Sequence, residues 1–538
     1  MAAAKQPSYC ATDQRPVYSL LRHSPAFVLL VIVIADGGQL ADPDLWNNLR
    51  AGQIILSTHH LTLYDSFSYT AFGHLWRNHE WLSQVAFAAA YNTLGVFGLK
   101  VLKLLCAAAT ISFLALGFAQ TAAPARVQRA VLAVTAMALL PQIQFRPQLA
   151  TFVLLSLVLA LLARDTYRTS SRLWPLVLIF ALWANLHGGY LVGVAAVATY
   201  AAVVTADELR RGQGWGRGAR LAATAAACAL ATLANPDGIG IWRTVMTSIT
   251  DPLVHKGLAE WQPLLSRIGF EWHAYPPGVI IYLLPLALFA ALALSLFLAP
   301  GMDDAGLVAI AALFIIGAFI SARNMALAVI ALSIPLARHF GIFLGNPAAS
   351  LLTGIAPIGR VVNAEPAPAA ADADWRFNPM VSIGLAIAIT AATGLLSNRL
   401  TIDEHCPVGA VAFMKRHNLR GNVLDDYDWG NYLTWHIAPQ SKVFVDGRSD
   451  QLYPTRVIAD YYDFYYGSSS AERVLDKYPH DFVLVPPDSK GYGVVANNPN
   501  WKLIYRDSDA ALFARATSQA GQLPDVTVTG SAGPKFFP

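Results

Sequence analysis

The sequence is short of charged residues. Only 13% of its 538 residues are Asp, Glu, Lys or Arg, against about 25% in an ordinary soluble protein. The formal net charge is only +4, which gives no support to nucleic acid as a partner. The cysteines, which are also few, lack metal-ligand spacing, and we expect no internal disulfide. They are Cys10, Cys106, Cys228 and Cys406.

Apolar residues make up 55% of the chain. Most lie in runs of roughly 17 to 25 residues, the length that crosses about 30 Å of hydrocarbon. We therefore predict a multi-spanning α-helical membrane protein with about eleven spans, and partners that include membrane lipid. The first run lacks a small-residue cleavage site, so no cleavable signal peptide is expected. The candidate spans are residues 24–41, 96–119, 127–143, 148–163, 173–187, 190–206, 219–234, 277–299, 305–322, 324–341 and 378–396.

Lys and Arg orient these spans, because they gather in cytoplasmic connections. With the N-terminus inside, the inner connections hold most of the basic residues near the spans, whereas the long first outer loop, residues 42–95, holds few. One pair, Lys100 and Lys103, falls at the outer end of the second span and does not fit. The topology is therefore N-in and C-out, and residues 400–538 lie outside the cytoplasm.

Three regions follow from this pattern. Residues 1–399 form the transmembrane bundle, residues 400–515 an extracytoplasmic α/β domain, and residues 516–538 a flexible tail. In the first outer loop, residues 45–58 and 81–94 have the helical period of amphipathic helices lying in the outer interface. The Ala/Pro-rich stretch 365–374 is typical of a linker.

The α/β domain is predicted from short elements of both kinds. Residues 408–418 have a helical pattern, whereas "KVFVDGR" (442–448) and "DFVLVPP" (481–487) are rich in strand formers. The stretch 501–515 predicts a β-hairpin that turns at residues 507–509.

Polar residues gather at the outer ends of the spans. Ionisable groups near membrane depth are costly and usually face a functional interior, so clusters at one level favour one shared site that faces outward. These clusters are "DPDLW" (42–46), "NHEW" (78–81), "FRPQ" (145–148), "NLHGG" (185–189), "NPDG" (235–238) and "SARN" (321–324).

The acids of the first outer loop are the candidate catalytic groups. Asp42 is equally suited to cap the helix that follows, whereas Asp44 lies within that helix and cannot cap it in the same way. Glu80 is either a solvated acid or a third catalytic group. His79, next to it, suits an accessory binding role.

Basic groups at the same level are candidate ligands for substrate. Arg146 and Arg323 either reach lipid headgroups, as single arginines often do, or hold a phosphate through bidentate bonds. His187 lies beside Gly188 and Gly189, which allow a close backbone approach, and suits a hydrogen bond to substrate.

The outer domain adds aromatic and charged candidates. Trp429, Tyr432 and Trp435 have the spacing of a carbohydrate-binding face, although such aromatics more often build core. Arg448 follows a strand in "DGR" and is either a substrate ligand or part of a structural turn.

The strings "DPDLWNNLRAG" (42–52), "HEWL" (79–82), "DYDWGNYLTW" (426–435) and "VFVDGR" (443–448) resemble the GT-C glycosyltransferases, near a bacterial branch that modifies lipopolysaccharide. The acid pair after the first span, the interfacial helices and the C-terminal outer domain share this resemblance. The Trp-Trp-Asp-Tyr-Gly signature of oligosaccharyltransferases is not matched, because Trp429 follows Asp428 here and no Trp pair is present. Peptide-sequon recognition is therefore not carried over.

The resemblance implies a hexosyl- or pentosyltransferase of the bacterial inner membrane, with its site facing the periplasm. The donor would be a sugar on a polyprenyl phosphate or diphosphate, transferred with inversion to an envelope glycan, lipid or protein. The family's first-loop acid maps onto Asp42 or Asp44 without distinction. If a metal takes part, Mg²⁺ or Mn²⁺ bound by these two acids suits their hard oxygen ligands.

Two other functions use the same polar end. A transporter or flippase of lipid-linked glycans would need a polar cavity but no chemistry. Its hallmark is charged or broken segments at the bilayer midplane, whereas the clusters here lie at the outer ends. A polysaccharide polymerase or ligase would instead use a diphosphate-linked oligosaccharide donor.

Overall fold

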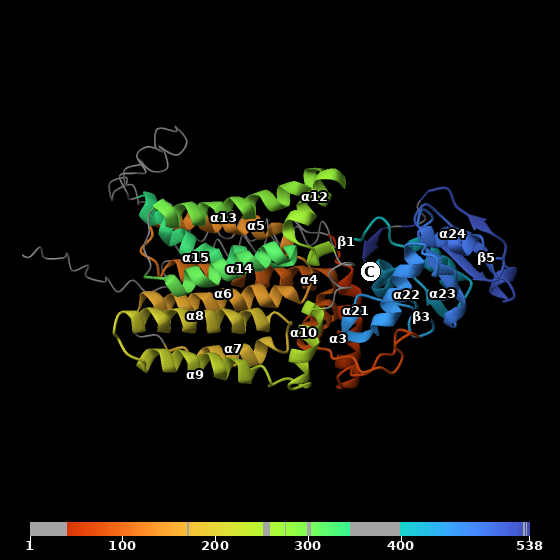
Figure 1. Ribbon diagram of the computed structural model, residues 1–538. Helices are drawn as coiled ribbons and strands as arrows, with labels where there is room; N and C mark the ends of the chain where they lie inside the picture. Colours follow the sequence, from red (N-terminus) through yellow and green to blue (C-terminus); the bar gives the residue numbers. More distant parts are fainter. Residues whose placement is uncertain are drawn as a thin grey trace, which may run out of the picture.

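The computed structural model describes residues 40–168, 172–250, 259–274, 276–298, 303–344, 399–530, 533 and 535–537. Helices of the bundle lie side by side, and a smaller α/β domain lies against one end of them (Figure 1). We call it the outer domain after its predicted side of the membrane. The predicted spans 24–41 and 378–396 and the linker 365–374 fall outside the described residues, apart from Leu40 and Ala41.

Five helices of the described part are long and apolar enough to cross a bilayer. They match the predicted spans at 96–119, 148–163, 190–206, 277–299 and 324–341. Each of these spans is a continuous apolar run, which is the property that a helix needs in lipid. The five are α4 (Trp81–Phe118), α6 (Gln148–Tyr167), α8 (Tyr190–Arg210), α13 (Ile280–Leu298) and the stretch Ala322–Leu344, which joins η4 (Ala322–Asn324) to α15 (Met325–Leu344).

Other predicted spans contain shorter helices. The region 173–187 holds α7, whose nine residues rise only about 14 Å and do not cross a bilayer by themselves. These helices pack beside the longer ones and complete the bundle (Figure 1). They are α5 (Ala125–Leu139) with η1 (Leu140–Gln142), α7 (Pro175–Trp183), α9 (Gly216–Ala231) and α14 (Ala305–Ile320).

The helices near the outer domain follow the predicted first loop. The amphipathic stretch forms α3 (Asp44–Thr58), which lies across the end of the bundle and packs against α4 (Figure 1). The second stretch, predicted as 81–94, is continuous with α4, but Gly95 breaks the helix at φ 61° and ψ −144°. Glycine tolerates this conformation because it has no Cβ. The same end carries α10 (Gly240–Thr250), η2 (Ala259–Trp261), α12 (Leu264–Ala274) and η3 (Pro276–Val279).

The outer domain is built on a mixed six-stranded sheet. Its strand order is β3-β2-β4-β6-β5-β7, with parallel β3, β2 and β4 followed by antiparallel β6 and β5. The β5–β6 pair confirms the predicted hairpin, and β3 and β4 lie in the predicted strands. The strands are β2 (Asn422–Leu424), β3 (Lys442–Val443), β4 (Phe482–Val485), β5 (Trp501–Arg506), β6 (Ala511–Arg515) and β7 (Val526–Thr527).

Both faces of this sheet are covered. Every residue of β4 is buried, although alternate side chains of a strand point to opposite faces. Phe482 and Leu484 belong to a core shared with the bundle, whereas Val483 and Val485 pack in a second core. The first face carries α19 (Val408–Arg416) and α20 (Gly430–Ile437), preceded by η7 (Tyr427–Trp429). Near the second core lie α21 (Ser449–Leu452), α22 (Thr455–Tyr465), α23 (Ala471–Lys477) and α24 (Lys490–Ala496).

The last residues differ from the expected flexible tail. After η8 (Ala520–Gln522), β7 pairs with β5, and β8 (Phe536–Phe537) pairs with β1 (Leu400–Thr401). Phe537 is buried and packs against Trp46 of α3 with ring centroids 5.3 Å apart. The short apolar "FF" at 536–537 therefore closes the contact between the outer domain and the bundle.

Candidate functional site

The acid pair lies where the chain enters α3. The backbone N–H of Ala41 donates to the carbonyl of Thr401 at 2.8 Å, which ties this entry to the outer domain. Both oxygens of Asp42 are occupied: Oδ1 accepts from the N–H of Asp44 at 2.9 Å, and Oδ2 accepts from Nε of Arg146 at 2.6 Å. Asp42 therefore accepts the first N–H of α3 from the position before the N-cap, which is Pro43, and also pairs with an arginine.

Asp44 is in a different environment. Its side chain is 41% exposed, against 6% for Asp42. Its Oδ2 lies 3.6 Å from Nε of Arg146, and its Oδ1 accepts from Nδ2 of Asn431 at 3.1 Å. Partial desolvation by the surrounding protein raises the pKa of Asp44 to about 6, against the opposing charge of Arg146. Asp44 thus keeps accessible oxygen surface and binds a proton more readily than an ordinary aspartate.

The two predicted arginines come together through an acid that the sequence analysis missed. Glu260 of η2 accepts from Nη1 of Arg146 through Oε2 and from Nη1 of Arg323 through Oε1, each at 2.9 Å. Arg323 also lies over the ring of Trp261 at 4.9 Å. Burial opposes ionisation of Glu260, but Arg323 and Arg146 lower its pKa overall, so it bridges the two guanidinium groups as a carboxylate.

Glu80, His79 and His187 form the third part of the site. Oε1 of Glu80 lies 3.7 Å from Nε2 of His79 and 3.6 Å from Nε2 of His187. Burial lowers the pKa of His79 to about 4. Burial raises the pKa of Glu80 to about 7, with the charge of Asp44 adding to the rise. Two imidazoles therefore face an acid that exchanges its proton near neutral pH.

The glycines next to His187 allow neighbouring side chains to approach the backbone closely, as predicted. A Cβ on Gly189 would lie 2.2 Å from Oγ1 of Thr151, and one on Gly188 would lie 3.2 Å from Nε2 of His79. The N–H of Gly189 donates to Nδ1 of His187 at 3.1 Å. Because Nδ1 accepts this bond, the ring proton lies on Nε2 and points toward Glu80.

The outer domain contributes a second residue group that the sequence analysis missed. Asn431 donates to Asp44 through Nδ2, and its Oδ1 accepts from the N–H of Gly447 at 3.2 Å. A Cβ on Gly447 would lie 2.5 Å from Nδ2 of Asn431 and 2.7 Å from Oδ1 of Asp44. "DGR" is a visible signal for a turn, but nothing local indicates that its glycine faces the acid pair.

Two predicted ligands of the outer domain are not brought to the site, and we correct both. Trp429 is 4% exposed and packs in the shared core, so it offers no face to a sugar. Arg448 is 3% exposed and pairs with Asp65 and Asp446, each at 2.6 Å. A buried arginine needs such partners, and here they fasten the first outer loop to the domain.

The other members of the predicted aromatic face are also used in packing. Tyr432 is buried with its ring 5.5 Å from that of Trp46, and the ring of Trp435 lies 6.4 Å from that of Phe537. These aromatics join α20 to α3 and to β8. Trp429, Tyr432 and Trp435 therefore build core, which is one of the two interpretations that the sequence left open.

No protein-family model and no curated protein matches this sequence. Several solved structures are similar to it in fold, and three of them are described here. ArnT from Cupriavidus metallidurans bound to undecaprenyl phosphate is 12% identical, with a TM-score of 0.49 over 94% of this chain and 99% of that one. The arabinofuranosyltransferase AftD from Mycobacteria is 14% identical, with a TM-score of 0.48 over 92% of this chain and 40% of that one.

The third similar structure is the Archaeoglobus fulgidus oligosaccharyltransferase, 13% identical, with a TM-score of 0.46 over 95% of this chain and 75% of that one. Two of these neighbours are named as transferases of a sugar or an oligosaccharide, and the third is bound to undecaprenyl phosphate. Since every TM-score is below 0.5, the function is inferred from the site itself.

Proposed function

We propose that this protein is a membrane glycosyltransferase that moves a sugar from a polyprenyl-phosphate carrier to an acceptor outside the cytoplasm. The observation that supports this proposal is that polar residues from separate connections of the bundle come together. Residues from three separate connections meet at one end of the bundle: Asp44 and Glu80 come from the first outer loop, and Arg146 and Glu260 each come from a different later connection. In this proposal the chain has eleven spans, N-in and C-out, in a bacterial inner membrane, and this end faces the periplasm.

The donor phosphate binds between Arg146 and Arg323. Glu260 supports this assignment, because its two carboxylate oxygens each accept a bond from one of these arginines. Carboxylate and phosphate present similar oxygen pairs to a guanidinium group. The donor phosphate takes the place of the Glu260 carboxylate, whose side chain is 38% exposed and therefore has room to withdraw.

Asp44 is the general base, and Asp42 positions Arg146. Asp42 has both oxygens engaged, whereas Asp44 has one oxygen held by Asn431 and surface left for an acceptor hydroxyl. The raised pKa of Asp44, about 6, makes it a stronger base than an ordinary aspartate while it stays mostly ionised at neutral pH. Glu80, with the two histidines, binds and orients the acceptor.

The reaction is a single displacement. The acceptor oxygen forms a bond to the anomeric carbon as its proton moves to Asp44. The bond from that carbon to the phosphate oxygen breaks on the opposite side, and the phosphate leaves with the electron pair. Attack opposite the leaving group inverts the anomeric configuration. Arg146 and Arg323 stabilise the negative charge that collects on the phosphate.

A divalent metal does not fit between the two aspartates. The guanidinium of Arg146 lies 2.6 Å from Asp42 and 3.6 Å from Asp44, so it already neutralises the oxygens that Mg²⁺ or Mn²⁺ would need. Among the described residues, no group of three His, Cys, Asp or Glu side chains is arranged to hold a metal ion. In this proposal the two aspartates act through Arg146 and the acceptor, and no cation is assigned to them.

The test uses purified protein, a radiolabelled polyprenyl-phosphate sugar and an envelope extract as acceptor. Wild type should transfer label to the acceptor, and Asp44→Asn should lose a factor of about 10² to 10⁴ in rate. Asp525→Asn is the matched control, because Asp525 is exposed in the outer domain and accepts a hydrogen bond from Thr527 of β7. Movement of the labelled lipid across vesicles without any transfer would instead support the flippase.

A further inference from the structure

A row of four tyrosines lies along the C-terminal part of α22 and its cap residue. Tyr461 and Tyr465 are stacked with ring centroids 5.6 Å apart and planes at 27°, and Tyr462 and Tyr466 are stacked at 5.9 Å and 18°. The i, i+4 spacing of a helix produces both pairs. Tyr461 is buried, Tyr462 and Tyr465 are half-buried, and Tyr466 is 57% exposed. The row therefore runs from the domain core to its surface.

Two acids lie beside this tyrosine row. Besides burial, the charges of Asp426 and Asp428 raise the pKa of Tyr465 to about 12, and Asp428 acts in the same direction on Tyr462. Asp426 is buried, whereas Asp428 is exposed. The surface thus combines flat aromatic rings with one exposed carboxylate, that of Asp428.

Tyr427 connects the row to the candidate active site. Its ring lies 6.2 Å from that of Tyr461, and its N–H donates to the Tyr461 hydroxyl at 3.1 Å. Tyr427 lies four residues before Asn431, whose Nδ2 donates to Oδ1 of Asp44 at 3.1 Å, so the chain leads directly from the row to the proposed base. After burial, the charge of Asp44 is the largest cause that raises the pKa of Tyr427. Figure 1 shows α21 and α22 on the part of the domain nearer the bundle, with α24 and β5 farther away.

We propose that Tyr427, Tyr462, Tyr465 and Tyr466 form an acceptor-binding subsite for a neutral glycan chain, whose end reaches Asp44. This inference rests on the proposed function and narrows its acceptor to a carbohydrate. The C–H face of a sugar ring packs against an aromatic face, and its hydroxyls donate to carboxylates. The exposed carboxylate of Asp428 disfavours an acidic glycan through like-charge repulsion.

The assignment differs from the aromatic face first suggested by the sequence. Trp429 and Tyr432 are at most 5% exposed and fill the core, whereas the tyrosine row keeps accessible ring surface. Tyrosine gives a rigid contact at low entropic cost, because its side chain has only two torsions to order. Continuity with Asp44 through Tyr427 is what favours the acceptor over an unrelated protein partner.

Binding is measured by fluorescence anisotropy with labelled neutral glucan, mannan and galactan oligosaccharides. The full-length protein is held in nanodiscs, because glycosidic detergents would compete for the subsite. At least one oligosaccharide should bind the wild type, and the double variant Tyr462→Ala/Tyr466→Ala should bind it about tenfold or more weakly. Tyr462→Phe/Tyr466→Phe should retain most of the affinity, because the ring faces remain.

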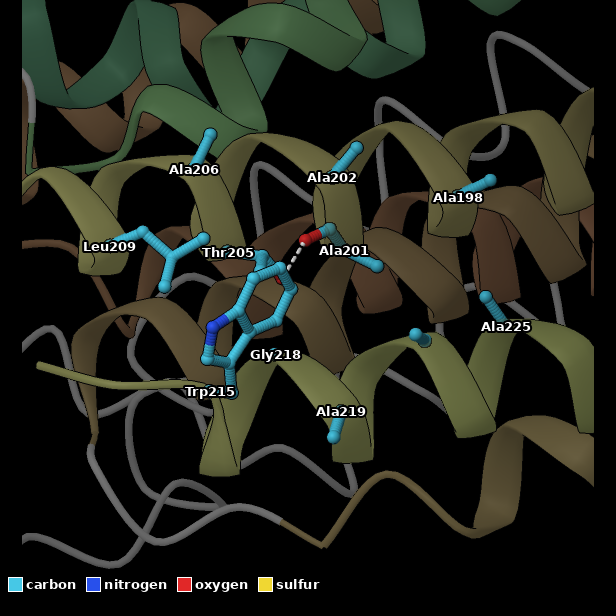
Figure 2. A pocket seen from close by; sticks show the side chains of 11 residues that line it. Ala198, Ala201, Ala202, Thr205, Ala206, Leu209, Trp215, Gly218, Ala219 and Ala225 are labelled. Carbon is cyan, nitrogen blue, oxygen red and sulfur yellow. Dashed lines mark hydrogen bonds between the residues drawn. The ribbon is translucent and has the colours of Figure 1, made fainter.

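Trp215→Ala is the matched control, since Trp215 is an exposed aromatic (69% exposed) in the α8–α9 connection, where it lines a shallow apolar groove (Figure 2). It should bind oligosaccharide like the wild type. Equal binding by the tyrosine-to-alanine variant, or no binding of any neutral oligosaccharide to the wild type, would overturn the proposal. So would displacement of the probe by a uronic-acid polymer as readily as by a neutral glycan.

The subsite and the proposed function fail in different ways. If labelled sugar is transferred while no oligosaccharide binds the tyrosine row, the enzyme assignment stands and the subsite is wrong. If oligosaccharide binds the row but no transfer occurs, the subsite stands and the glycosyltransferase assignment is wrong. Asp44→Asn is therefore used in the transfer assay alone, where it should lower the rate by a factor of about 10² to 10⁴.

Discussion

Gly447→Ala tests whether the outer domain sets the position of the base. The new Cβ would lie 2.5 Å from Nδ2 of Asn431 and 2.7 Å from Oδ1 of Asp44, both well inside van der Waals contact. The hydrogen bond between these two atoms is 3.1 Å long, so the methyl group would push on both of its ends. Something must move, and the terminal atoms of the two side chains are the parts best able to do so.

The magnitude follows from where the strain goes. Extra volume in a packed site costs about 1–3 kcal/mol, and a displacement of about 1 Å in a catalytic group costs about 10² in rate. We therefore expect kcat for sugar transfer to fall about 10²-fold, with a modest loss of thermal stability. The KM for donor should change little, because Arg146 and Arg323 bind the phosphate from the bundle.

The assay combines steady-state transfer kinetics with a double-mutant cycle. Asn431→Ala alone removes the hydrogen bond to Asp44, and the pair Asn431→Ala/Gly447→Ala removes the closest clash as well. Because the two residues act on the same carboxylate, their effects on kcat should not add. Wild-type kcat in Gly447→Ala at unchanged stability, or strictly additive effects in the cycle, would refute the idea that this contact positions the base.

The charges of the site lead to three further predictions. Since the pKa of Asp44 is raised to about 6 and only its ionised form accepts a proton, kcat should fall as pH drops through about 6; a flat profile down to pH 5 in the wild type would contradict this. Glu260→Gln should weaken the bridge between Arg146 and Arg323 and lower the Kd for polyprenyl phosphate, measured by isothermal titration, by about threefold or more. A higher Kd would instead mean that Glu260 helps the arginines to bind the phosphate. Asp42→Asn should lower the free energy of unfolding by about 1–3 kcal/mol, because the buried partner of Arg146 loses its charge. Asp44→Asn should leave thermal unfolding nearly unchanged, and equal losses in both variants would contradict the different roles given to the two acids.

The level of the site could be predicted from the sequence because apolar spans have a fixed length. Short connections on the same side of a bundle must end at the same depth, so the amino-acid pattern alone is enough to place "DPDLW", "NHEW", "FRPQ", "NLHGG" and "SARN" together. The structure brings Asp42, Arg146, Arg323 and His187 to that level together with Glu80. The Gly95 break also falls where the sequence separates an interfacial helix from a span.

Pairings within that level could not be predicted, because they depend on packing between distant parts of the chain. Asn431 lies 387 residues from Asp44, and no local pattern marks it as different from other asparagines. Glu260 lies in a short 3₁₀ helix with no motif around it. The aromatic stripe Trp429, Tyr432 and Trp435 is ambiguous for another reason: helical spacing is the same for a side that faces solvent and one that faces α3.

These two failures point to the same property of the molecule. The aromatics that bury α20 against α3 are on the helix that carries Asn431, so the packing that removes them from a sugar-binding role is what brings the amide to Asp44. Asp44 is thereby held from the bundle by Arg146 and from the outer domain by Asn431. A base fixed from two sides keeps its geometry only while the domain stays docked. The outer domain is therefore part of the proposed catalytic apparatus, and its contact with α3 is where stability and activity are coupled.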